Sequence, residues 1–219
     1  MTTHLAATGA PVLAIELDST FARRLQDLTG RFPNLTIVSG DVLKTDIAKL
    51  AAGRRVRIYG NLPYYITSPI LHHLFSFAGI IEEMHIVIQT EVAQRLTAKP
   101  NNSQYGYLSV ATQLYARPEF VFRIPRGAFL PPPDVGSSLV TLRLPGESVK
   151  LAPRDESPFL EFVKSCFSQK RKTLVNNLKS EAPRDAIRNA LAALKLRPDA
   201  RAEQVSVPVF AALYERLKT

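Results

Sequence analysis

The sequence predicts a protein of the α/β class, with a sheet domain over residues 1–147 and a small all-helical domain over residues 148–219. In the first part, strand-like runs alternate with helix-like runs, which is typical of a mostly parallel sheet in a three-layer domain. The last two strand-like runs of this part indicate a closing antiparallel pair. After residue 158 the apolar residues recur at helical spacing only. With 219 residues, 46% of them hydrophobic, the chain can bury the core that such a domain and appendage require.

The first two predicted strands each end in acidic residues. Residues 12–18 read as a buried strand that contains Glu16 and Asp18, and residues 35–39 as a strand followed by Asp41. A carboxylate at the first position can accept both hydroxyls of a ribose, and one at the second can accept an adenine amine. Such acids also cap helices. We favour the cap for Asp18, whereas for Glu16 and Asp41 both interpretations stay open.

The third strand, residues 56–59, leads into the most informative segment of the chain, Asn61-Leu62-Pro63-Tyr64-Tyr65-Ile66-Thr67-Ser68-Pro69. In open α/β sheets, ligands bind beyond the carboxyl ends of the strands, so this segment is well placed for a site. Thr67 or Ser68 followed by Pro69 predicts the N-cap and first turn of the next helix.

The first four residues of this segment suit chemistry on a nucleobase amine. The lone pair of such an amine is delocalised into the ring, and two hydrogen-bond acceptors would localise it. The side-chain carbonyl of Asn61 and the backbone carbonyl of Leu62, held by the stiff Pro63, can supply both acceptors. Tyr64 would stack on the base, a contact worth about 1–3 kcal/mol. Taken alone, the four residues are also common in ordinary turns, so the context decides.

The rest of the chain supplies that context. A loop over residues 127–138 carries three consecutive prolines and Phe129, and we interpret it as a rigid wall that presents Phe129 to a pocket, with docking of a polyproline-binding partner as the alternative. His85 is interpreted as a packing residue. We predict further strands over residues 84–89, 120–124 and 138–144, and helices over residues 19–28, 90–98, 107–115, 159–167, 173–178, 186–194 and 207–217.

The charge of the chain predicts a polyanionic partner. The net charge is +9, which favours nucleic acid before an anionic membrane. Lys170, Arg171 and Lys172 follow one another at a predicted helix junction, where they form either a solvated turn or a phosphate contact. A lone Cys166 and scattered histidines predict neither a disulfide nor a metal site. No run of about eighteen apolar residues and no signal peptide is found, so we expect a cytoplasmic protein and no membrane association.

In this order the motifs resemble the ribosomal RNA adenine N6,N6-dimethyltransferases, specifically the small-subunit dimethyladenosine transferase family. The resemblance implies a Rossmann-like class I methyltransferase sheet with helices on both faces. It also implies dimethylation of the N6 amines of adjacent adenosines near the 3′ end of 16S ribosomal RNA, with S-adenosylmethionine as cofactor and the pre-30S subunit as partner. We expect a monomer. The resemblance runs through residues 12–18, 40–42, 60–64, 89–96, 105–110, 129–135 and 167–174.

The resemblance also implies roles for cofactor and base contacts. Glu16, with Leu17 beside it, would bind the cofactor ribose, and Asp41, with Val42 beside it, the cofactor adenine. Asn61 would lie between cofactor and target amine.

Tyr64 and Phe129 would sandwich the flipped adenine and offset part of the unstacking cost. Lys170, Arg171 and Lys172 would hold the RNA with the helical tail.

The chain departs from the family pattern in two places. Tyr65 stands where the family usually has asparagine, a change that we expect to be tolerated. The family also carries a strand and a glycine-rich loop before the part that Met1 begins here, so we expect this chain to be a shortened version with impaired turnover. The alternatives are a non-catalytic ribosomal RNA-binding assembly factor and a large-subunit RNA adenine methyltransferase. A DNA adenine methyltransferase fits less well, because no separate base-reading domain is found.

Overall fold

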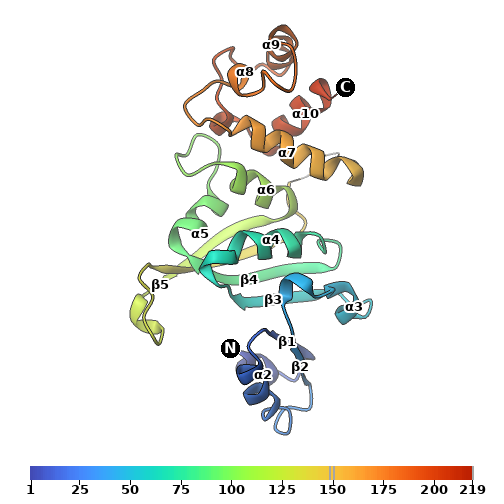
Figure 1. Ribbon diagram of the computed structural model, residues 1–219, viewed down its shortest axis with the longest axis vertical. Helices are drawn as coiled ribbons and strands as arrows, with labels where there is room; N and C mark the ends of the chain where they lie inside the picture. The colour runs from blue at the N-terminus through green and yellow to red at the C-terminus, as the bar shows by residue number, and fades with distance from the viewer. Residues whose placement is uncertain (148, 150, 219) are drawn as a thin grey trace. The chain divides into compact units, whose positions relative to one another are not determined.

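The computed structural model describes residues 1–147, 149 and 151–218, and its mixed α/β architecture agrees with the predicted class (Figure 1). The chain forms two compact units. The first holds Met1–Val56 and Ile66–Ile80, and the second holds Arg57–Tyr65 and the chain from Ile81 onward. The described strands make two sheets, one of two strands in the order β1-β2 and one of four in the order β3-β4-β6-β5.

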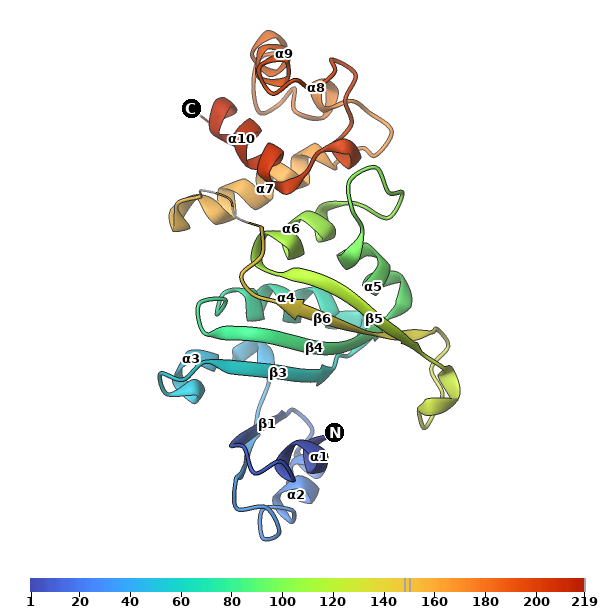
Figure 2. The same ribbon diagram turned by 180° about the vertical axis from the view of Figure 1, so that it is seen from behind.

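The first unit is built on two parallel strands, β1 (Val12–Glu16) and β2 (Leu35–Ser39), which pair in register. Helices α1 (Thr2–Ala6) and α2 (Ser19–Gln26) pack against them, as Figure 2 shows. A 3₁₀ turn η1 (Val42–Lys44), helix α3 (Ile47–Ala51) and helix α4 (Thr67–Phe75) complete the unit. The short α3 was not predicted, because its five residues are too few for a clear helical period.

Asp18 caps α2, as expected. Its carboxylate oxygen Oδ1 accepts hydrogen bonds from the backbone N–H groups of Thr20 (2.7 Å) and Phe21 (3.1 Å). These backbone hydrogen bonds, the one from Phe21 above all, lower the pKa of Asp18 below its ordinary value. The residue therefore has a local structural role.

The predicted N-cap of α4 is wrong. The helix already begins at Thr67, and the cap position is Ile66, which makes no side-chain cap bond. The 3₁₀ turn η2 (Tyr64–Ile66) leads directly into the helix, which includes both Thr67 and Ser68, so neither takes the extended backbone of an N-cap residue. Pro69 lies in the first turn, as predicted. The apolar face that the sequence indicated is buried at Ile70, Leu71, Leu74 and Phe75.

The second unit contains the four-stranded sheet. Strand β4 (Ile81–Gln89) and strand β5 (Arg117–Ile124) both run antiparallel to β6 (Ser137–Arg143), so the predicted closing pair is confirmed. β3 (Val56–Asn61) forms one edge of this sheet, and β5 forms the other. Side chains on one face of β4 are buried, helix α5 (Thr90–Thr97) contacts β4, β5 and β6, and helix α6 (Tyr107–Tyr115) contacts β5 (Figure 2).

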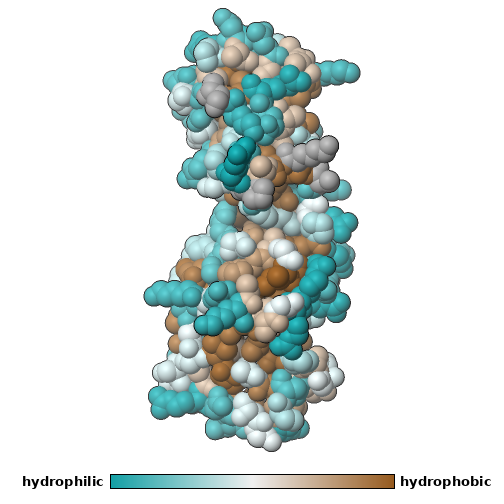
Figure 3. Space-filling view, turned by 90° about the vertical axis from the view of Figure 1, so that its right-hand side faces the viewer, coloured by the Kyte–Doolittle hydropathy of each residue, from teal (hydrophilic) through white to brown (hydrophobic). Residues whose placement is uncertain are grey.

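After β6 the chain is helical, as predicted. The helices are α7 (Glu156–Cys166), α8 (Leu174–Asn177), α9 (Arg184–Ala193) and α10 (Val207–Leu217). On the face seen in Figure 3, many hydrophilic side chains lie on this part of the molecule. Apart from η1 and η2, short 3₁₀ turns lie at Arg126–Ala128 (η3), Pro153–Asp155 (η4) and Ala202–Gln204 (η5).

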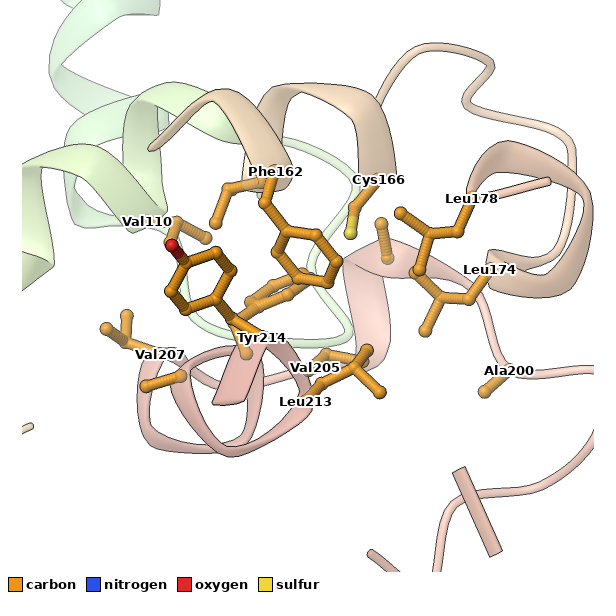
Figure 4. Close-up of a cluster of buried hydrophobic side chains, with 14 of the residues drawn as sticks. Val110, Phe162, Cys166, Leu174, Leu178, Ala200, Val205, Val207, Leu213 and Tyr214 are labelled. Carbon is orange, nitrogen blue, oxygen red and sulfur yellow. The ribbon is translucent and has the colours of Figure 1, made fainter. Parts of the chain in front are cut away.

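One hydrophobic core joins these helices to α6. Val110 of α6 lies beside Phe162 and Tyr214 in Figure 4. The ring of Tyr214 packs edge-on against Phe159, with 5.8 Å between the centroids, and tilted against Phe162 at 5.5 Å. The domain boundary expected at residues 147 and 148 stays a prediction, and residue 148 lies outside the described residues.

No helix in the described part of the chain is long and apolar enough to cross a membrane.

Candidate functional site

The first unit presents two carboxylates at one edge of its sheet. Glu16 ends β1, and Asp41 lies just beyond the end of β2, whose Ser39 pairs with Glu16. The backbone N–H of Gly40 donates to the carbonyl of Glu16 (2.9 Å), so the parallel pairing continues past the end of the strands. Both carboxylates therefore lie at the carboxyl edge, where α/β sheets bind their ligands.

Each carboxylate uses one oxygen locally. Oε1 of Glu16 accepts from the backbone N–H of Asp18 (2.9 Å), and Oδ1 of Asp41 accepts from that of Leu43 (2.9 Å) and caps η1. An ionised carboxylate has two oxygens and about four acceptor positions, so both residues retain capacity for further donors. Leu17, which is 67% exposed, and the half-buried Val42 add apolar surface beside them. Such an edge suits a nucleoside, which offers hydroxyls, an amine and a flat ring.

In the second unit the segment from Asn61 to Tyr64 leaves the carboxyl end of β3. Asn61 is the last residue of the strand and is exposed, so its amide is open to solvent. Leu62 is anchored through its backbone and its side chain. The backbone N–H donates to the carbonyl of Val87 (3.0 Å), and the side chain is buried. A Cβ added to Gly60 would lie 3.0 Å from Cδ2 of Leu62, so the glycine makes room for that side chain. Pro63 then fixes the backbone before the turn η2.

A buried serine holds Tyr64. The phenol oxygen of Tyr64 and Oγ of Ser137 form a hydrogen bond of 2.5 Å, and Ser137 is only 1% exposed. Ser137 pairs with Gln89 at the end of β4 and with Ile124 at the end of β5. The phenol of Tyr64 is thus fixed where the carboxyl ends of two other strands meet the start of β6. The sequence did not indicate Ser137, because nothing near it in the chain points to Tyr64.

A second pair of bonds closes the same junction. Thr90 donates its backbone N–H to the carbonyl of Gly136 (2.8 Å), and its hydroxyl lies 2.9 Å from that of Ser138. A side chain at Gly136 would come within 3.3 Å of the Thr90 hydroxyl. The end of the proline-rich loop is therefore tied to the start of α5.

Phe129 lies on the loop that leaves and returns at this junction. The loop begins after Ile124 and ends at Ser137, which pair with each other. Phe129 is half-buried, and its backbone N–H donates to the carbonyl of Arg126 (3.2 Å). The structure therefore brings the segment of Asn61 and Tyr64 and the loop of Phe129 to one edge of one sheet.

The run of three cations follows α7, and all three residues are exposed. Nζ of Lys170 donates to the backbone carbonyl of Ser103 (2.7 Å), so this lysine also ties down the loop between α5 and α6. The same loop is held by the Tyr105 hydroxyl, which donates to the carbonyl of Val205 (2.9 Å). Within the described residues, the side chains of Arg171 and Lys172 make no ion pair or hydrogen bond, so these two cations are the ones open to a ligand.

His85 and Cys166 are explained by packing. The His85 ring stacks on Tyr59, with centroids 4.9 Å apart, and Nδ1 lies 3.1 Å from the Thr141 hydroxyl. Cys166 is buried, and burial raises the pKa of its thiol far above the ordinary value, so the reactive thiolate does not form. Among the described residues, no three side chains of the His, Cys, Asp or Glu type converge as metal ligands would.

Comparison with known proteins gives consistent matches over the whole chain. The family model described as "Ribosomal RNA adenine dimethylase" matches residues 1–219. "Ribosomal RNA small subunit methyltransferase A" of Acidobacterium capsulatum is 40% identical over 220 residues, which cover 100% of this chain and 77% of that protein. The protein of the same name from Acinetobacter baylyi is 38% identical over 221 residues, which cover 97% of this chain and 79% of that protein.

Two solved structures share the fold. A dimethyladenosine transferase from Plasmodium falciparum superposes with a TM-score of 0.79 at 24% identity, over 98% of this chain and 86% of that one. The 23S rRNA methyltransferase ErmE superposes with a TM-score of 0.69 at 26% identity, over 95% of this chain and 82% of that one. The predicted class I methyltransferase fold is confirmed by these likenesses.

Proposed function

This chain belongs to the ribosomal RNA adenine dimethylase family, and from that premise we propose how its residues serve the reaction. The protein is a ribosomal RNA adenine N6-methyltransferase that uses S-adenosylmethionine and dimethylates adenines of 16S ribosomal RNA. The observation that carries this function is the identity of about 40% to small-subunit enzymes along the entire chain. Adjacent adenosines near the 3′ end of that RNA are the targets that we propose.

The alternatives have less support. Large-subunit RNA is named for ErmE, but this chain is 26% identical to ErmE and 40% identical to a small-subunit enzyme. A non-catalytic assembly factor would not need an exposed amide, an anchored backbone and a fixed tyrosine at the end of a strand, and this chain has all three in Asn61, Leu62 and Tyr64.

The carboxylate edge of the first unit fits the nucleoside part of S-adenosylmethionine. We propose that the second oxygen of Glu16 accepts from the ribose hydroxyls and that of Asp41 from the adenine amine, while Leu17 and Val42 contact the ring. The fit rests on the acceptor capacity that each carboxylate keeps after its local bond. When bound, S-adenosylmethionine supplies an electrophilic methyl group. The predicted cofactor contact of Asn61 stays a prediction.

Asn61 and Leu62 prepare the target amine. The Asn61 side-chain oxygen and the Leu62 backbone carbonyl accept hydrogen bonds from the two N–H groups of the adenine amine. These bonds draw the nitrogen lone pair out of the ring and make it available to attack the methyl group. The anchored Leu62 and the fixed φ of Pro63 mean that the backbone acceptor needs little reorganisation as the reaction proceeds. This preorganisation is the chain's catalytic contribution.

Tyr64 and Phe129 hold the target base. The bond to Ser137 holds the hydroxyl end of Tyr64 in place, so less side-chain entropy is lost when a base stacks on the ring. Phe129 is presented by a loop that returns to the same junction. We propose that the two rings sandwich the flipped adenine, which offsets part of the few kcal/mol that unstacking costs.

The helical tail holds the RNA. We propose that residues 148–219 form the RNA-binding domain and that Lys170, Arg171 and Lys172 contact phosphates of the pre-30S particle. The net charge of +9 supports a polyanionic partner. We further propose a monomer that acts in the cytoplasm, where the small subunit is assembled.

Transfer of labelled methyl groups from S-adenosylmethionine tests the function. Small ribosomal subunits that lack the modification are expected to take up label in dimethyladenosine, whereas large subunits are not. Label found only in large subunits would contradict the small-subunit assignment. Tight binding of small subunits without any transfer would favour the assembly-factor alternative.

Neutralising Arg171 and Lys172 together is expected to weaken RNA binding. The plot of log K against the log of the salt concentration should also become less steep, by about 1 for each phosphate that the variant no longer neutralises. Lys170→Gln is expected to have a smaller effect, because part of its role is the bond to Ser103. Binding is measured by fluorescence anisotropy over a salt series. Arg197→Gln is the control, since Arg197 already pairs with Asp199 through two hydrogen bonds. An unchanged slope in the double variant would refute the phosphate contacts.

A further inference from the structure

The loop between β5 and β6 carries an apolar side chain that neither the fold nor the proposed chemistry uses. Leu130 is 98% exposed, whereas its neighbour Phe129 is half-buried. Isolated apolar residues are common on protein surfaces, so exposure alone means little. The position of Leu130 gives it meaning, because it directly follows the residue proposed to stack on the flipped base.

The loop holds Leu130 out from the surface in a stiff frame. Pro131, Pro132 and Pro133 follow it, and each fixes its own backbone φ. Nε of Arg126 donates to the carbonyl of Pro133 (2.6 Å), which closes the loop across its base. The backbone bond from Phe129 to Arg126 adds a turn on the same side. A backbone held in this way loses little freedom when the loop meets a ligand.

The loop is also rooted at the proposed site of the reaction. Its two ends, Ile124 and Ser137, pair with each other, and Ser137 holds the Tyr64 hydroxyl. An RNA strand that delivers a base to Tyr64 therefore reaches the junction from which the loop of Leu130 extends.

The charges of the loop fit an RNA strand. Arg126 is exposed on the loop, Arg123 is exposed near the end of β5 just before it, and Asp134 is the single acidic residue of the loop. Two guanidinium groups in this part of the chain can hold phosphates of an RNA strand. RNA carries a phosphate at every nucleotide, so charge complementarity and the family's RNA substrate together favour RNA as the partner of this loop.

We propose that Leu130 enters the base stack of the RNA at the place that the target adenosine leaves. Proteins that distort nucleic acids insert leucine and similar apolar side chains between bases in this way, and the inserted group replaces part of the stacking that the flipped base gave up. Leu130 thus acts as a positioning residue that stabilises the flipped state, while Tyr64 and Phe129 receive the base. This inference rests on the proposed function of the site.

The test compares two RNA hairpins that differ only in the state of the target adenosine. In the first hairpin the target adenosine is stacked in the loop on the adjacent adenosine. In the second hairpin the target adenosine is bulged out, so that the bases on either side of it already stack on each other. Leu130→Ala is expected to bind the stacked hairpin about tenfold more weakly than the unaltered chain, because the gap in the stack stays empty. Its affinity for the bulged hairpin should change by less than about twofold, since phosphate contacts are kept.

Two further variants serve as controls. Leu130→Met keeps an apolar side chain of similar volume and should bind the stacked hairpin like the unaltered chain. Val135→Ala removes a 43% exposed apolar group from the same loop and should leave both affinities unchanged. Equal losses on the two hairpins, or no loss on either, would overturn the proposal. Failure of the unaltered chain to methylate either hairpin would instead count against the proposed function, because the binding comparison needs no methyl transfer.

Discussion

Replacing Asn61 with alanine is expected to lower methyl transfer by a factor of about 10²–10³ while RNA binding stays within about twofold. The variant removes the side-chain acceptor that draws the lone pair out of the adenine ring, and it leaves the anchored Leu62 and the fixed Tyr64 in place. Asn61 is exposed at the end of β3, so folding should be little affected. Single-turnover transfer and anisotropy binding, measured on the same RNA, separate the two effects.

Two variants sharpen this experiment. Asn61→Asp keeps a side-chain oxygen as acceptor and should retain more transfer than Asn61→Ala, although its charge changes the site. Asn176→Ala removes an exposed amide of the helical tail and should leave transfer unchanged. If Asn61→Ala weakened binding and transfer in equal proportion, Asn61 would be an RNA contact and the acceptor role would be wrong.

Replacing Gly146 with alanine is expected to cost about 3 kcal/mol of stability. A Cβ at this position would lie 2.5 Å from the backbone N of Ala116 and 2.7 Å from the backbone carbon of Tyr115, and it would also meet the carbonyl oxygen of Gln113. These are backbone atoms at the end of α6, so they cannot turn aside as a flexible side chain does. For a chain of this size the midpoint of thermal unfolding should fall by roughly 6–12 °C.

Circular dichroism during heating measures this change. Gly127→Ala is the matched control, because a Cβ there meets nothing within 4 Å and Gly127 belongs to the same unit. The two variants make the same covalent change, so the difference between their unfolding midpoints isolates the clash. Equal midpoints would show that the chain after β6 shifts freely and that the close approach of Gly146 to α6 is not needed for stability.

Local patterns were predicted well. Strand β2 and helices α6 and α10 have the predicted bounds. Most other elements begin or end within a few residues of their own predicted bounds. The cap by Asp18 was also correct, since a cap joins residues two or three positions apart. The cap of α4 was misplaced because the turn η2 feeds directly into the helix, and no residue type marks that continuation.

The candidate site was predicted in part. The sequence indicated Asn61, Tyr64 and Phe129 through their motifs, and the structure brings their segments to one edge of a sheet. It did not indicate Ser137, the partner of Tyr64, nor the bond from Lys170 to Ser103. Both bonds join residues far apart in the chain, 73 and 67 positions respectively, and neither partner carries a pattern that points to the other.

The sequence by itself determined the class of the fold, the order of its elements and the family, because strand and helix periods, caps and short motifs are set by residues close together in the chain. Only the tertiary structure decided how Tyr64 is fixed, which cations are already engaged and where Gly146 must stay small. Those properties come from hydrogen bonds and close packing between distant segments, and such contacts exist only after β4, β5 and β6 have paired and α6 has packed on the helices that follow.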